Sequence, residues 1–126
     1  MKHNAINWFE LQASDLNRAR AFYEAILDTN LWEVGGNGTH KMLMFPCDER
    51  SGGVSGAICS FSTCQPGEGG TMVYLNVDGE LDAVLARVVP AGGRICMDRT
   101  AIPPHGFIGV IVDSEGNNVG LHSRDE

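Results

Sequence analysis

Phe-Glu-Leu-Gln at residues 9–12 is followed, sixty-four positions later, by Val-Tyr-Leu-Asn at residues 73–76. Both runs alternate apolar and polar side chains, which is the period of a strand with one buried face. An aspartate follows each run, Asp15 and Asp78, and a segment with apolar residues at helical spacing comes next. The second aspartate comes one residue sooner, so the repeat is imperfect, but the chain contains a β-α unit twice.

The rest of each half continues the repeat in the same order. Glycine and proline clusters divide the chain into short segments, and the run over residues 64–70 is rich in both and predicts a linker. Each half is predicted to read β-α-β-β-β. The predicted strands span residues 6–13, 39–46, 54–61, 71–77, 94–98, 107–113 and 118–123, and the predicted helices span residues 15–27 and 81–89.

This order limits the architecture of the chain. At 126 residues the chain is long enough for one domain with its own core. One strand, one helix and three further strands make a small curved sheet with a helix on one face only. Two such modules, over about residues 4–63 and 71–124, would pair and enclose a cleft. The sequence therefore predicts a single α+β domain over residues 1–126, in which two βαβββ modules form paired curved mixed sheets around a cleft.

Composition argues against several classes of partner. The net charge is −7 and the nine basic residues are scattered, which disfavours nucleic acid and anionic membranes. No apolar run approaches the roughly 20 residues of a spanning helix, and the first residues lack a signal-peptide core, so a cytoplasmic protein is predicted. The four cysteines form no C-x-x-C pair, which favours reduced, mostly buried thiols.

Two longer motifs frame the repeat. One is Glu10 to Leu16 followed by Arg18 to Tyr23, and the other is Asp113 to Asn117 followed by Val119 to Ser123. Together with the helix that runs into Ala-Gly-Gly at residues 91–93, they resemble the vicinal oxygen chelate proteins, the group of glyoxalase I, bleomycin-resistance proteins and extradiol dioxygenases. The resemblance covers nearly the whole chain. It implies the paired-module fold and, for a chain of this length, a homodimer with clefts at the interface.

The resemblance also implies where a metal would bind. Enzymes of this group hold a divalent metal with His and Glu side chains from the first and last strands of each half. The first-strand positions fall at Trp8 and Met72, the final-strand glutamate at Gly120, and its counterpart at Gly56 or Ala57. None of these side chains suits a divalent metal. The usual ligands are therefore predicted to be missing, and the cofactor stays open.

Two residues further along the strands, on the same face, the chain places Glu10, Tyr74 and His122. As an acid-base set, His122 could pass a proton, Glu10 could act as base or orient the imidazole, and Tyr74 could donate to an oxyanion. The same residues could instead form a satisfied buried network without chemistry. Glu10 and His122, completed by waters, could also hold a metal at a shifted site.

Further residues are predicted to contact a ligand in the cleft. By the sixty-four-residue repeat, Ile58 is the fourth equivalent of the polar set, on its apolar side. Trp8 and Met72 offer an apolar wall. Cys59 could face either the cleft or the helix, and His105 lies in a proline-containing loop that could cover the cleft.

Two functions remain open from the sequence. The first is a glyoxalase-like enzyme, a lyase or isomerase or a dioxygenase-related activity, acting on a small carbonyl or hydroxy compound without the usual metal route. The alternative is a non-catalytic protein that binds and sequesters a small apolar or aromatic molecule, as the bleomycin-resistance branch does. A regulatory module with an idle cleft is a third possibility. No residue in the chain identifies the ligand.

Overall fold

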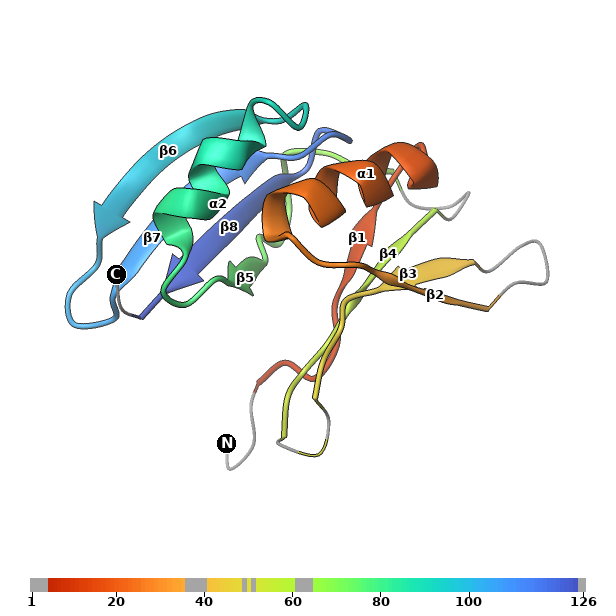
Figure 1. Ribbon diagram of the computed structural model, residues 1–126, viewed down its shortest axis with the longest axis horizontal. Coiled ribbons are helices and arrows are strands. Elements are labelled where there is room, and N and C mark those ends of the chain that lie inside the picture. Colours follow the sequence, from red (N-terminus) through yellow and green to blue (C-terminus); the bar gives the residue numbers. More distant parts are fainter. Residues whose placement is uncertain (1–4, 36–40, 49, 51, 61–64, 125–126) are drawn as a thin grey trace.

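The computed structural model describes residues 5–35, 41–48, 50, 52–60 and 65–124. It contains two four-stranded sheets, each with one helix, and so confirms the predicted α+β class (Figure 1). The first module consists of β1 (Glu10–Gln12), α1 (Leu16–Leu27), β2 (Trp32–Val34), β3 (Met42–Met44) and β4 (Ala57–Cys59). The second consists of β5 (Tyr74–Asn76), α2 (Leu81–Val88), β6 (Arg94–Ala101), β7 (Phe107–Val112) and β8 (Asn118–Ser123).

The two sheets have the same topology. Their strand orders are β1-β4-β3-β2 and β5-β8-β7-β6. In each sheet the first strand pairs in parallel with the last, and the other neighbours pair antiparallel. Strand β2 falls where the sequence predicts no element, because its three residues are all exposed and leave no alternation of burial. Residues 39, 40, 61 and Cys64, which belong to predicted elements or to the linker, lie outside the described residues.

Local chemistry explains where helix α1 begins and ends. Asp15 has extended backbone, and its carboxylate accepts a hydrogen bond from the Arg18 amide at 3.0 Å, which makes Asp15 the N-cap of the helix. The helix ends at Asp28, whose left-handed backbone has φ 51°. The buried stripes of the two helices pack on the sheets, and α1 lies beside α2 in Figure 1. These stripes comprise Ala19, Phe22, Tyr23 and Ile26 on α1 and Leu81, Val84 and Val88 on α2.

The turn between β7 and β8 joins the second module to the first. Asp113 is 3% exposed, and its carboxylate accepts a hydrogen bond from the Tyr23 hydroxyl of α1 at 2.7 Å. Burial, together with the charge of Asp113, raises the pKa of Tyr23 well above its ordinary value, so the phenol remains a donor. Asn117 donates from its side chain to the Gln12 carbonyl of β1 at 2.7 Å. The motif at residues 113–117 is therefore an inter-module contact.

A second contact from the same turn is ionic. Arg18 Nε and Glu115 Oε2 lie 2.7 Å apart, and the Asp15 amide donates to Glu115 Oε1 at 2.8 Å. The Glu115 side chain is buried, whereas that of Arg18 is exposed. Burial raises the pKa of Glu115, but hydrogen bonds from Arg18 and the Asp15 amide outweigh it and hold the pKa below its ordinary value. The ionised form of Glu115 therefore stabilises the folded state.

We expect the free energy of unfolding to fall as the pH drops below the ordinary glutamate pKa of about 4.3. Because the folded-state pKa of Glu115 is lowered, its contribution is complete above the unfolded value and is lost as pH falls through the folded value. Urea titrations at a series of pH values between about pH 6 and about pH 3 give the free energy of unfolding at each pH. This free energy should fall more steeply with decreasing pH for wild type than for Glu115→Gln. Glu68→Gln, at an exposed position, should follow wild type. Equal slopes for wild type and Glu115→Gln would contradict the prediction.

Within the described residues, neither helix has the length and hydropathy needed to cross a bilayer.

Cys47, Cys59 and Cys96 are free thiols, but only Cys59 is buried and Cys96 is exposed. The expectation of mostly buried thiols therefore fails for the three cysteines described.

Candidate functional site

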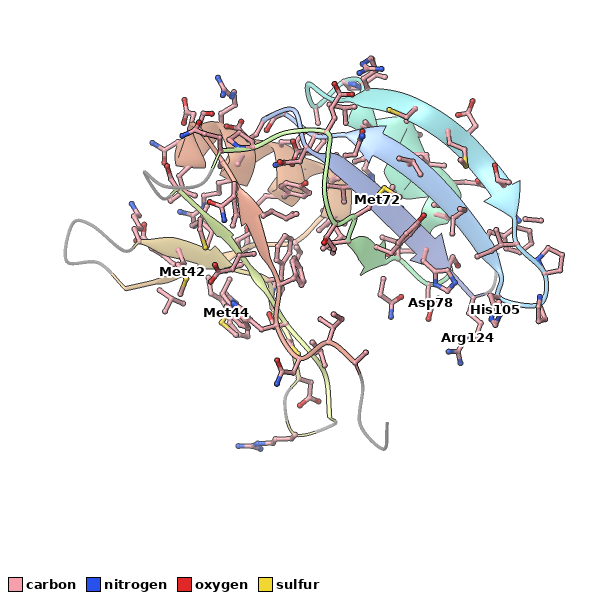
Figure 2. All side chains as sticks on the ribbon, turned by 180° about the vertical axis from the view of Figure 1, so that it is seen from behind. Met42, Met44, Met72, Asp78, His105 and Arg124 are labelled. Atoms are coloured by element: carbon pink, nitrogen blue, oxygen red, sulfur yellow. The ribbon has the colours of Figure 1, made fainter. Side chains whose placement is uncertain are left out.

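A cavity of about 1190 Å³ lies between the two modules. Both duplicated strands border it, and the lining runs through consecutive residues 8–12 and 71–77. Within each run, every second side chain shares one face of its strand. Figure 2 labels Met72 just ahead of β5 on the second module. The alternate residues of the two duplicated strands that line the cavity are Trp8, Glu10 and Gln12 from the first module and Met72, Tyr74 and Asn76 from the second.

Glu10 has two neighbours that set its surroundings. The Trp8 indole Nε1 donates a hydrogen bond to Glu10 Oε2 at 3.1 Å. Burial of Cys59, with the charge of Glu10 and a hydrogen bond to it, raises the pKa of the Cys59 thiol to about 11. Cys59 is fully buried and paired with Gln12, and the described cavity lining does not include it. It therefore remains a protonated thiol that supports Glu10, which makes it an unsuitable nucleophile.

The predicted acid-base set is not brought together in the cavity. Glu10 and Tyr74 both line it, but His122 does not. His122 pairs with Asn76 across β5 and β8, and its Nε2 lies 2.6 Å from the His105 carbonyl oxygen. A carbonyl only accepts, so that ring nitrogen is the donor.

His105 also lies outside the cavity lining. In Figure 2 it appears with Asp78 and Arg124 at the end of the β5–β8 pair, away from Met72. The Arg124 amide donates to Asp78 at 2.6 Å, which closes that end of the sheet. The shifted metal pair of Glu10 and His122 and the loop contact from His105 are consequently not assembled in this cavity.

The expectation that Ile58 lines the cleft is wrong. The spacing between paired residues of the first and last strands differs by one residue between the two modules. Glu10 faces Ala57 in the first module, whereas Tyr74 faces Gly120 in the second. A shift of one residue moves a side chain to the other face of a strand. The counterpart of His122 is therefore Cys59, and Ile58 packs in the hydrophobic core.

The positions that the family uses for metal ligands do not fit a metal here. A side chain at Gly56 would collide with the Phe9 ring, and one at Gly120 with the Tyr74 ring, so aromatic rings fill the space of the last-strand ligands. Trp8 and Met72 at the first-strand positions are not ligands for a hard or borderline cation. In the described part of the chain, no three His, Cys, Asp or Glu side chains are grouped so that they could hold a metal ion.

Gln12 is a site residue that the sequence did not single out. It lines the cavity, and its Oε1 is buried without a hydrogen bond from any residue that the structure describes. A buried acceptor without a partner is uncommon and costs free energy. The only sequence signal for Gln12 is that it shares one strand face with Trp8 and Glu10.

Comparisons with known proteins agree with this fold. The family model described as the Glyoxalase/Bleomycin resistance protein/Dioxygenase superfamily matches residues 5–121. A Mycobacterium bovis protein provisionally named glyoxylase CFP32 is 29% identical over 123 residues, covering 91% of this chain and 44% of that protein. The chain thus spans less than half the length of the curated relatives it matches.

Solved structures extend the likeness to the whole fold. A glyoxalase/bleomycin resistance protein from Albidiferax ferrireducens T118 superposes with a TM-score of 0.69 at 20% identity, covering 94% of this chain and 98% of that one. The fosfomycin resistance protein FosX from Listeria monocytogenes gives 0.65 at 18% identity, covering 98% and 92%. At these identities the likeness shows the fold alone.

Proposed function

Because the chain belongs to the glyoxalase/bleomycin resistance protein/dioxygenase superfamily, we propose that it binds a small organic molecule in the cavity between its two modules. The observation that carries the proposal is the lining of this cavity. Apolar side chains occupy the first-strand positions that hold metal ligands in related enzymes, and the described cavity lining includes no histidine. The residues present therefore favour binding over metal-assisted or histidine-assisted turnover.

The size and surface of the cavity support binding. A volume of about 1190 Å³ is slightly above the range of roughly 300–1,000 Å³ typical of small-molecule sites. Trp8 and Met72 are each 38% exposed and Tyr74 is 44% exposed, although they lie on a concave surface. A ligand body that covered these three side chains would remove apolar surface from water, at about 25 cal/mol per Å².

Turnover is the second candidate function. It is favoured by one observation, that Glu10 and Tyr74 line the same cavity. Glu10 would abstract a proton next to a carbonyl, and the Tyr74 hydroxyl would donate to the developing oxyanion. With His122 directed to the His105 carbonyl, the described lining places no histidine beside them.

A thermal-shift screen with aromatic and carbonyl compounds tests the proposal. We expect ligands that stabilise wild type, since binding to the folded state alone raises its stability. Trp8→Ala should weaken their binding by about tenfold or more, because it removes a wall of the cavity. Trp32→Ala is the matched control, since Trp32 is a similarly exposed tryptophan on β2 outside the cavity lining.

The outcomes separate the two functions. Ligand recovered chemically unchanged after incubation, by mass spectrometry, would agree with binding alone. Ligand recovered as a product would make turnover the function, and Glu10→Gln should then abolish it. An equal loss of binding in Trp32→Ala would place the ligand elsewhere. The homodimer expected from the resemblance remains a prediction that light scattering would test.

A further inference from the structure

The charge of the cavity lining has one sign. The described lining includes the carboxylates of Glu10 and Glu80 but no lysine, arginine or histidine. Two basic side chains outside the lining are held in ion pairs, Arg18 with Glu115 on the turn and Arg99 with Asp82 on α2. The whole chain carries a net charge of −7, which adds a field of the same sign. An anionic ligand would lose hydration in this cavity without gaining an opposite charge.

The polar groups of the lining also favour one kind of partner. Gln12 Oε1 is a buried acceptor that receives no hydrogen bond from the described residues. Glu10 lies two residues away on the same strand face, which places the two side chains roughly 7 Å apart at their backbones. Gln12 Oε1 lacks a donor, whereas the Glu10 carboxylate is exposed, already accepts from the Trp8 indole and contributes a negative charge. An ammonium group carries three donors and no acceptor, so it matches this pair better than a carboxylate or phosphonate does.

The aromatic residues act in the same direction. Trp8 and Tyr74 line the cavity from opposite modules, and both remain partly exposed. A cation near the face of an indole or phenol ring is attracted by the electrons of the ring, even at exposed sites. The hydrogen bond from Trp8 Nε1 to Glu10 holds a carboxylate next to the indole, so charge attraction and ring contact are available at one place.

We infer that the ligand is an organic cation, an amine or amidinium on an apolar body, rather than an anion. Its nitrogen would lie at Glu10 and Gln12, and its body would cover Trp8, Met72 and Tyr74. This inference rests on the proposed function, because it assigns the chemical class of the ligand for the same cavity.

Three probes built on one naphthalene body test the inference by calorimetry. They are 2-(aminomethyl)naphthalene, which is cationic, 2-naphthamide, which is neutral, and 2-naphthoate, which is anionic. Wild type is expected to bind the amine about tenfold more tightly than the amide, and the naphthoate least. Added salt should weaken the binding of the amine and leave the affinity for the amide nearly unchanged.

Variants locate the effect. Glu10→Gln should weaken the affinity for the amine about tenfold and change the affinity for the amide by less than about twofold, because the substitution removes a charge but little volume. Glu68→Gln is the matched control, since Glu68 is exposed and outside the described cavity lining. It should leave all three affinities as in wild type.

Equal affinities for the three probes, or tightest binding of the naphthoate, would overturn the inference and leave the proposed function standing. A preference for the amine that persists in Glu10→Gln would overturn the assigned position of the cation. Binding of none of the probes would also overturn the inference. The proposed function itself would fall only if the broader thermal-shift screen found no ligand either.

Discussion

Asp113→Ala is expected to lower the free energy of unfolding by about 4 kcal/mol, because it leaves several buried donors without an acceptor. The Asp113 carboxylate accepts four hydrogen bonds: from the Tyr23 hydroxyl at 2.7 Å, the Asn117 side chain at 3.0 Å, and the Glu115 and Asn117 amides at 2.9 Å each. A loss of this size is a large part of the roughly 5–15 kcal/mol that stabilises an ordinary domain.

Three further variants make this prediction specific. Tyr23→Phe should cost about 1.5 kcal/mol, because Asp113 keeps its other donors. The double variant should cost less than the sum of the single ones, since both remove one shared hydrogen bond. Asp98→Ala, at an exposed position on β6, should change stability by less than about 0.5 kcal/mol. Urea unfolding followed by circular dichroism measures all four, and a cost of less than about 1 kcal/mol for Asp113→Ala would refute the prediction.

Gly93→Ala is expected to cost about 3 kcal/mol, because the new methyl group has no space between the modules. A Cβ at Gly93 would lie 2.7 Å from Phe22 Cε1 and 2.7 Å from the Val112 carbonyl oxygen. Phe22 is a core residue of α1, and the Val112 carbonyl belongs to the backbone of β7. Neither neighbour can move without disturbing the packing of α1 on the second module.

Gly69→Ala provides the matched control for this prediction. No heavy atom lies within 4 Å of the position that a Cβ would take there, and its φ is not in the left-handed region. We therefore expect a change of less than about 0.5 kcal/mol. Urea midpoints of the two alanine variants give the comparison. Similar midpoints would mean that Phe22 and the β7 backbone yield easily and that the inter-module packing is loose.

Much of the fold was predictable because its signals are local. The apolar periods of α1 and α2, the N-cap at Asp15 and the glycine and proline clusters each act within a few residues of the chain. The duplication then extends these signals to the arrangement of two sheets. Strand β2 escaped prediction because three exposed residues carry no periodic pattern of burial.

The candidate site was predictable only in part. Trp8, Glu10, Met72 and Tyr74 line the cavity as predicted, together with the residues between them along each strand segment. Ile58, which the repeat assigned to the cavity, does not line it, and neither does His122, which a two-residue step along the last strand assigned there. The place of the His122 ring depends on its contact with the His105 carbonyl in a separate loop. The place of Ile58 depends on the pairing of a first strand with a last strand that lies about 46 residues further along the chain. That register is not encoded near either strand.

Three features follow from consecutive residues: the order of the elements, the duplication of the module and the side-chain face of each first strand. They do so because a strand's alternation and a helix's period are local properties of the chain. Three others required the folded molecule: that Cys59 rather than Ile58 supports Glu10, that the His122 ring is directed to the His105 carbonyl, and that Gln12 Oε1 lacks a donor. Each of these depends on the register between separate strands and on which groups folding leaves unpaired, and a shift of one residue reverses the face.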